Sequence, residues 1–293
     1  MNSSSPELRV PAERLPEAGL VDLLHLVHGV AGKLAVDFFV AGAMARDLIL
    51  YNVFGQKPSR LTLDVDLGIR VSGWGQFRAL KDALLQTGAF SAAPGTDYRL
   101  HYRPARMPLD LVPFGQIETT EGKIAWPPNG DWEMNVAGFE EAQKAALSVE
   151  IAHGFSVPVA SLPAIALLKL VAWQERRNAT NKDAADLLLL LKSYATAGNL
   201  DRLYDIETQW LEAFDHHPDL AGAALLGQDS ALLCTPSTTA LIKGILTTST
   251  LRQLLTDQMV RASSGVADLG NAGNPERYLE AFARGFTALG GDS

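Results

Sequence analysis

Two stretches of sequence decide the fold of this chain: Val36-Asp37-Phe38-Phe39-Val40-Ala41-Gly42-Ala43-Met44-Ala45-Arg46-Asp47-Leu48 and Leu63-Asp64-Val65-Asp66-Leu67-Gly68-Ile69-Arg70. The apolar residues of the first stretch predict a buried strand from Val36 to Val40. The small residues that follow predict a turn, after which a helix is expected to begin near Met44. The second stretch alternates apolar and acidic residues, which predicts a strand with two different faces.

Asp64 and Asp66 are expected on one face of the second strand, with Leu63 and the apolar residues that alternate with it on the other. Side chains two residues apart on a strand are roughly 7 Å apart, so the two carboxylates repel each other. A divalent cation with oxygen ligands would offset this repulsion. The N–H groups at a helix start behind Gly42 would suit a phosphate. The combination predicts a metal–nucleotide site, and a solvated Asp-x-Asp strand edge is the alternative.

A third carboxylate, Asp110, lies in the predicted strand Leu109-Asp110-Leu111-Val112-Pro113-Phe114-Gly115. Both of its neighbours are leucines, so its side chain is expected to point to the opposite face from theirs. The preceding predicted strand, 98–103, carries Arg99 and two further basic residues on one face. Arginine forks match phosphate oxygens, so this face would suit a triphosphate. A solvent-exposed polar face is the alternative for both strands.

The composition limits the class of protein. The chain has 293 residues, of which 47% are hydrophobic, so a substantial core is expected. Its net charge of −8 argues against an extended basic groove for nucleic acid. The single cysteine, Cys234, excludes a disulfide within the chain and a cysteine-rich zinc site. With no secretory signal and no long apolar run, we expect a cytoplasmic protein without a membrane span.

Two domains are expected. The patterns predict an α/β (α+β) N-terminal domain with a mixed sheet, residues 1–160, and a helical C-terminal region, residues 161–293. Ser161 is a good helix N-cap and Pro163 suits the first turn that follows it, which sets the boundary. Residues 1–12 are expected to form a tail outside the core.

The helical region contains charged residues in apolar surroundings. Lys169 interrupts the apolar run of the first helix, and a lysine in such a place must reach solvent or meet an anion. Asp183 and Asp186 share one face of the next helix at i, i+3 spacing. A buried ion pair that holds two helices together is one interpretation, and a lysine with a role in a functional site is the other.

These motifs resemble the signature of the polymerase-β-like nucleotidyltransferase superfamily, in which a glycine turn opens a helix and an Asp-x-Asp strand follows. Gly42-Ala43 with Arg46-Asp47, and then Asp64-Val65-Asp66, match that order. The lysine and the sequence Lys182-Asp183-Ala184-Ala185-Asp186-Leu187 are similar to the helix pair of AbiEii-type nucleotidyltransferase-like proteins, which are related to type IV toxin–antitoxin systems. The resemblance covers about 36–191.

The resemblance implies transfer of a nucleoside monophosphate from an NTP to an acceptor hydroxyl, with Mg²⁺ or Mn²⁺ as the cofactor. It implies three metal ligands that also act in catalysis: Asp64, Asp66 and Asp110. It implies further catalytic residues from the helical region: Lys169 and Asp183. The residues that it implies for nucleotide binding are Gly42, Ala43, Arg46, Lys169 and Asp186.

Partners and acceptor stay open at this point. The acidic net charge favours a small molecule or a locally bound acceptor, whereas the toxin-like resemblance favours tRNA or protein and implies an antitoxin. The alternative is a catalytically silent member that binds a nucleotide or a partner. Two departures from the superfamily bear on this choice. Ala43 offers no hydroxyl to a phosphate, and a long insert that contains Gly55, Pro58 and Ser59 precedes the second strand.

Overall fold

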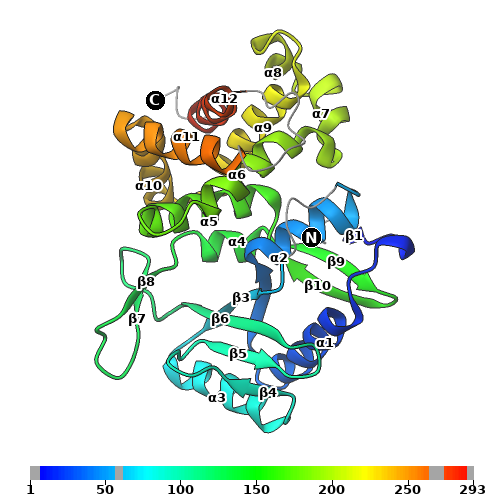
Figure 1. Ribbon diagram of the computed structural model, residues 1–293, viewed down its shortest axis with the longest axis vertical. Coiled ribbons are helices and arrows are strands. Elements are labelled where there is room, and N and C mark those ends of the chain that lie inside the picture. The colour runs from blue at the N-terminus through cyan, green and yellow to red at the C-terminus, as the bar shows by residue number, and fades with distance from the viewer. Residues whose placement is uncertain (1–6, 57–61, 264–273, 289–293) are drawn as a thin grey trace, which may run out of the picture. The chain divides into compact units, whose positions relative to one another are not determined.

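The computed structural model describes residues 7–56, 62–263 and 274–288. The chain folds into two units, Met1–Ser161 and Leu162–Ser293. The first unit holds the sheet and the second is helical (Figure 1). The expected insert residues Pro58 and Ser59 lie outside the described residues.

A mixed eight-stranded sheet forms the centre of the first unit (Figure 1). Its strands, in spatial order, are β1 (Glu7–Arg9), β9 (Leu147–Ala152), β10 (Phe155–Val159), β2 (Asp37–Ala41), β3 (Val65–Val71), β6 (Met107–Gly115), β5 (Arg99–Tyr102) and β4 (Phe90–Ala92). β2 and β3 are antiparallel, β3 and β6 are parallel, and β5 and β6 are antiparallel. A separate two-stranded sheet contains β7 (Lys123–Ala125) and β8 (Glu133–Asn135).

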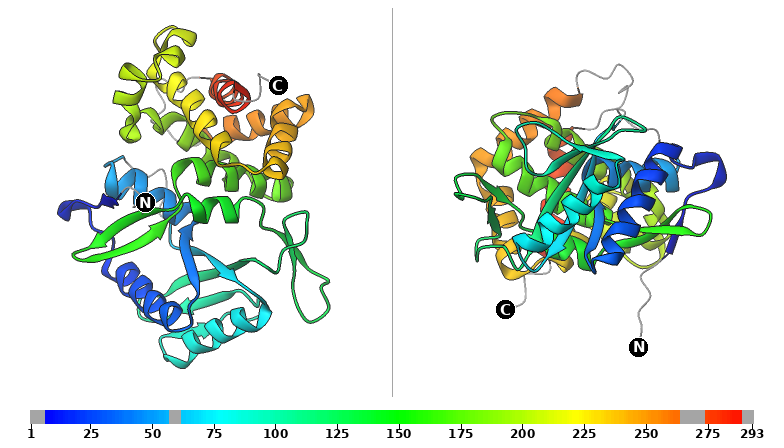
Figure 2. Two further views of the ribbon diagram at one scale, coloured as in Figure 1. Left: turned by 180° about the vertical axis from the view of Figure 1, so that it is seen from behind. Right: turned by 90° about the horizontal axis from the view of Figure 1, so that it is seen from below.

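The two faces of this sheet have different partners. Helices α1 (Ala18–Lys33) and α3 (Trp74–Gln86) lie side by side along the first face (Figure 2). That face carries the apolar residues that alternate along β3, of which Val65 and Leu67 are fully buried. The opposite face carries Asp66 and Gly68, and it contacts α4 (Phe139–Lys144). The candidate carboxylates therefore lie on the face away from α1 and α3.

An aromatic cluster fills the α4 face next to the candidate carboxylates. The rings of Phe39, Phe114 and Phe139 pack with centroids 5.7–5.9 Å apart. Gly68 makes room for this cluster, because a Cβ atom there would come within 2.3 Å of the Phe39 ring. Asp66 precedes Gly68 by two residues on the same face, so the cluster supports the strand that carries it.

Three local expectations were wrong. β3 begins at Val65, so Asp64 lies before the strand, and Leu63 is 66% exposed. Helix α2 (Gly42–Asp47) begins at the glycine itself, and it continues into a π-helical segment, Leu48–Val53. In the expected tail, β1 pairs in parallel with β9 at the edge of the sheet.

The second unit consists of helices. They are α5 (Leu162–Arg176), α6 (Lys182–Ser193), α7 (Leu200–Asp205), α8 (Thr208–Ala213), α9 (Pro218–Leu233), α10 (Pro236–Thr247), α11 (Ser249–Ser263) and α12 (Pro275–Ala288), with a π-helical segment at Ala195–Asn199. Apolar residues of α6 and α9 form much of the core, and the buried Trp173 on α5 adds to it. The expected helical character of the C-terminal region is thus confirmed.

Helices α9 and α12 approach at glycines. A Cβ atom on Gly227 of α9 would lie 2.1 Å from the carbonyl oxygen of Phe282, and one on Gly285 of α12 would lie 1.8 Å from that of Ala224. Backbone therefore meets backbone at both positions, which only glycine permits. This reciprocal contact fixes the crossing of the two helices.

Candidate active site

Gly42 and Asp66 form the centre of the candidate site in the first unit. Gly42 opens α2 with a φ of +64°, a conformation that favours glycine. A Cβ atom at this position would lie 2.0 Å from Oδ2 of Asp66. The glycine is thus required both by the turn and by the carboxylate beside it. Register explains the closeness, because Ala41, the last residue of β2, pairs with Asp66 of β3.

Asp66 and Asp110 are direct neighbours across two parallel strands. The register of β3 and β6 pairs Asp66 with Asp110, so both side chains lie on one face of the sheet. Neighbouring strands are about 4.8 Å apart, which is close enough for carboxylates to interact strongly. Asp110 is buried, with 8% exposure. Asp110 therefore lies on the strand next to that of Asp66.

Arg99 binds both oxygens of Asp110. Its Nε donates to Oδ1 and its Nη2 to Oδ2, both at 2.6 Å, across the antiparallel pair of β5 and β6. The hydrogen bonds with Asp110 raise the pKa of Arg99, and the charge of Asp64 adds to this effect. The sequence placed Arg99 on a basic face, but its attachment to Asp110 depends on the hairpin register.

The donor set suits a hard divalent cation. Asp64, Asp66 and Asp110 supply carboxylate oxygens, the ligands that Mg²⁺ and Mn²⁺ prefer. Gly42 leaves open the space that a side chain would take at Oδ2 of Asp66. In the described ranges, no three Asp, Glu, His or Cys side chains converge as a ready ligand group. The three-carboxylate set therefore stays a prediction.

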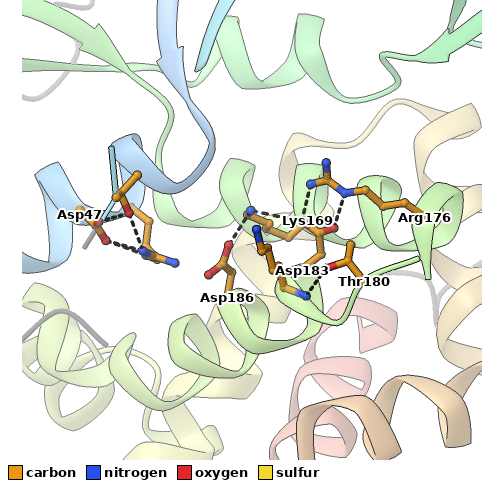
Figure 3. Close-up of polar contacts among 9 residues, drawn as sticks. Asp47, Lys169, Arg176, Thr180, Asp183 and Asp186 are labelled. Atoms are coloured by element: carbon orange, nitrogen blue, oxygen red, sulfur yellow. Dashed lines mark hydrogen bonds and ion pairs between the residues drawn. The ribbon is translucent and has the colours of Figure 1, made fainter. Parts of the chain in front are cut away.

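Arg46, predicted to contact nucleotide, is fully buried in the first unit. Its Nη2 lies 2.6 Å from Oδ1 of Asp47, and the hydroxyl of Thr62 donates to the other oxygen of Asp47 (Figure 3). Arg46 also donates to Thr62. This cluster ties α2 to the segment before β3, and the sequence offered no signal for the part of Thr62. A contact between Arg46 and nucleotide stays a prediction.

Lys169 joins α5 to α6 in the second unit (Figure 3). Its Nζ lies 2.6 Å from Asp186 and 3.2 Å from Asp183. All three side chains are buried, the two aspartates to within 2% of complete burial. The structure thus confirms that the lysine meets anions rather than solvent, and the charge cluster holds the two helices together.

Arg176 completes this cluster and was not predicted from the sequence. Its Nε and Nη2 donate to the two oxygens of Asp183 at 2.6 and 2.8 Å (Figure 3). The available signal was its position seven residues after Lys169, which puts both on one face of α5. Burial raises the pKa of Asp183, but the hydrogen bonds from Arg176 and the charge of Lys169 outweigh it and hold that pKa below its ordinary value.

An open cavity of ≈ 590 Å³ lies at the other end of β3. Its charged lining consists of Asp37, Arg70, Glu118 and Glu140, and no predicted site residue contributes to it. Arg70 and Glu140 pair at 3.2 Å within it. The candidate site is therefore the strand end near Gly42, not this cavity.

Comparisons with known proteins place these features in context. No curated protein matches the chain. The solved antibiotic-resistance factor ANT(2'')-Ia is 20% identical, with coverage of 69% of this chain and 100% of that chain and a TM-score of 0.40. An antigenic nucleotidyltransferase-like protein from Paracoccidioides brasiliensis is 18% identical, with coverage of 71% and 92% and a TM-score of 0.41. TM-scores this low support no inference about substrate.

The family comparison covers most of the chain. The family described as the nucleotidyl transferase AbiEii toxin of type IV toxin–antitoxin systems matches residues 26–263. This range includes the Gly42 turn, both strand aspartates of β3 and β6, and the α5–α6 helix pair. In the part of the chain that the structure describes, no helix has the length and apolar character needed to cross a membrane. The chain belongs to the AbiEii family of nucleotidyltransferases from type IV toxin–antitoxin systems.

Proposed function

We propose that the protein transfers a nucleoside monophosphate from an NTP to an acceptor hydroxyl. The acceptor oxygen forms a bond to the α-phosphorus, the bond from that phosphorus to the bridging oxygen breaks, and pyrophosphate leaves. One observation carries the proposal: Gly42 lies against the carboxylate of Asp66, and Asp66 lies in register with Asp110. A phosphate-binding turn and acidic ligands thus meet at one strand end.

The Gly42–Ala43 turn and the three carboxylates of the first unit each have a role in this proposal. Asp64, Asp66 and Asp110 would hold Mg²⁺ or Mn²⁺, which, when bound, neutralises triphosphate charge and lowers the pKa of the acceptor hydroxyl. An oxygen of Asp110 would take the proton of that hydroxyl. The N–H groups of Gly42 and Ala43 would donate to phosphate oxygens, which needs no hydroxyl at Ala43.

In the second unit, we propose that Lys169 contacts nucleotide phosphates and offsets the charge of the pyrophosphate. Asp183 and Asp186 would hold its ammonium group in position, as their contacts of 3.2 and 2.6 Å support. A lysine held in this way needs little reorganisation when it meets an anion. Arg176 also contacts Asp183, at 2.6 Å.

The acceptor belongs to one of three classes: RNA such as tRNA, a protein, or a small molecule. The family consists of toxins from toxin–antitoxin systems, so we propose that this protein has an antitoxin as a partner. The net charge of −8 indicates that an RNA acceptor would be held locally rather than along an extended groove. The alternative function is nucleotide binding without transfer.

Label transfer would test the proposal and identify the acceptor together. The protein is incubated with each α-labelled NTP, Mg²⁺ and a cell extract, and the extract is then separated into RNA, protein and small-molecule fractions. We expect label in one fraction, dependent on Mg²⁺. Absence of label with every NTP, in a protein that still binds Mg²⁺–NTP by calorimetry, would support the binding alternative instead.

A further inference from the structure

Arg99 binds the carboxylate of Asp110, which a divalent cation would also bind. We propose that Arg99 competes with the cation for Asp110, so that the cation binds fully only when Arg99 has left. This inference rests on the proposed function, which gives Asp110 to the cation. It adds to that function a positioning residue that controls when the ligand set is complete.

The geometry of the pair supports competition. Arg99 uses a two-pronged contact, 2.6 Å to each oxygen of Asp110, so neither oxygen is left without a donor. The register of β5 and β6 places the two residues directly opposite each other. Such forked, charge-assisted contacts are among the strongest hydrogen bonds in proteins. A cation that takes an oxygen of Asp110 must therefore weaken this contact.

Charge supports competition as well. The guanidinium group of Arg99 and a divalent cation repel each other. This repulsion is strong when both charges lie next to the buried carboxylate of Asp110, where little water screens them. Asp66 is the in-register neighbour of Asp110, so the fold brings two negative charges together at this point. Arg99 offsets that charge in the structure, and a cation would offset it in its place.

The exposure of the two partners shows which one can move. The side chain of Asp110 is 11% exposed, whereas that of Arg99 is 35% exposed. Arg99 can therefore turn toward solvent without opening the sheet, while Asp110 stays in place. A released guanidinium would also be available to a triphosphate, because its fork matches phosphate oxygens. The cation should consequently bind more tightly together with an NTP than alone.

Manganese binding measures the competition without reference to turnover. Free and bound Mn²⁺ are separated by electron paramagnetic resonance, for the full chain, with and without a non-reactive α,β-methylene NTP. Arg99→Gln removes the charge, and Arg99→Lys keeps the charge but removes the fork. Arg78→Gln is the matched control, since Arg78 is an exposed arginine of α3, which covers the sheet face away from the candidate carboxylates.

We expect Arg99→Gln to bind Mn²⁺ alone about tenfold more tightly than wild type, because no charge-assisted pair has to be broken. Arg99→Lys should lie between the two, and Arg78→Gln should match wild type. The gain should vanish in Arg99→Gln/Asp110→Asn. The lysine variant also tests the inference if the glutamine variant fails to fold.

Two other outcomes are distinguishable. Unchanged or weaker Mn²⁺ binding by Arg99→Gln, while wild type binds Mn²⁺ with the NTP analogue, overturns the competition and leaves the proposed function standing. Weaker binding would show that Arg99 supports Asp110 as a ligand. Absence of Mn²⁺ binding in wild type and in every variant, with or without the analogue, overturns the metal-dependent function and the competition together.

Discussion

Gly42 lies so close to Asp66 that a single methyl group on the glycine would come within 2.0 Å of the carboxylate oxygen. The contact joins the start of α2 to β3, two elements separated by an insert in sequence. It places the Gly42 turn, which we propose binds phosphate, directly against the carboxylate. A substitution at Gly42 should therefore act on the carboxylate directly.

Gly42→Ala should impair both activity and stability. The alanine must adopt a positive φ, which costs about 1–3 kcal/mol, and its Cβ must displace the Asp66 carboxylate. A displaced catalytic group of this kind lowers turnover about a hundredfold. Nucleotidyl transfer and urea unfolding are measured on the same preparation.

The matched control for that change is Gly29→Ala on α1, where a Cβ atom meets nothing within 4 Å. It should leave transfer unchanged and increase stability by about 0.5–1 kcal/mol, because alanine favours a helix. Wild-type transfer by Gly42→Ala would show that the position of the Asp66 carboxylate is unimportant.

Lys169→Met should strongly destabilise the helical unit. It leaves Asp183 and Asp186 buried with one fewer counter-charge, and loss of one partner of a buried ion pair costs about 3–5 kcal/mol. Chemical unfolding followed by circular dichroism measures the change. Lys182→Met, at an exposed position of α6, should change stability by less than about 0.5 kcal/mol. Equal stability of the two variants would contradict a structural role for the Lys169 cluster.

Stability should fall in acid partly through Asp183. The pKa of this carboxyl is held below its ordinary value of 3.8 in the folded protein, so near and below 3.8 the unfolded chain binds the proton first. The stabilisation is complete above that pH and is lost as the pH falls through the folded-state pKa. The midpoint of unfolding is measured from neutral pH to below pH 3.8. We expect it to fall less in Asp183→Asn than in wild type. An identical decline in both proteins would refute this assignment.

The α9–α12 contact makes a prediction about packing alone. Gly285→Ala should destabilise the protein by at least about 2 kcal/mol, because its methyl group meets the carbonyl oxygen of Ala224 at 1.8 Å. Gly244→Ala on α10 meets nothing within 4 Å and should be neutral or stabilising by about 0.5–1 kcal/mol. Thermal unfolding compares the two, and a tolerated Gly285→Ala would show that the helices can separate.

The sequence was sufficient for elements with a clear hydrophobic period. Alternation predicted strands β3 and β6 and the strand face on which Asp110 lies, whereas the pairing of these two strands is seen only in the structure. It could not place Asp64, because the start of β3 is set by pairing with β2, which ends at Ala41 opposite Asp66. Likewise, the short edge strand β1 has no period of its own and exists through pairing with β9.

Interactions between elements were the hardest features to predict. The fork of Arg99 on Asp110 follows from the β5–β6 register, and that of Arg176 on Asp183 follows from the packing of α5 on α6. Neither depends on local propensity, so neither can be derived from local pattern alone. Lys169 is different, because a lysine in an apolar run already demands an anion.

The most direct test of the central claim is label transfer by Asp64→Asn/Asp66→Asn beside wild type. Asparagine keeps the size of each side chain and removes the charge, so the fold should persist by circular dichroism. Asp97→Asn, in the exposed loop before β5, is the control for loss of a carboxylate. We predict that transfer falls at least about a thousandfold in the double variant only, because several kcal/mol of charge stabilisation disappear. Transfer at the wild-type rate by the double variant would contradict the account.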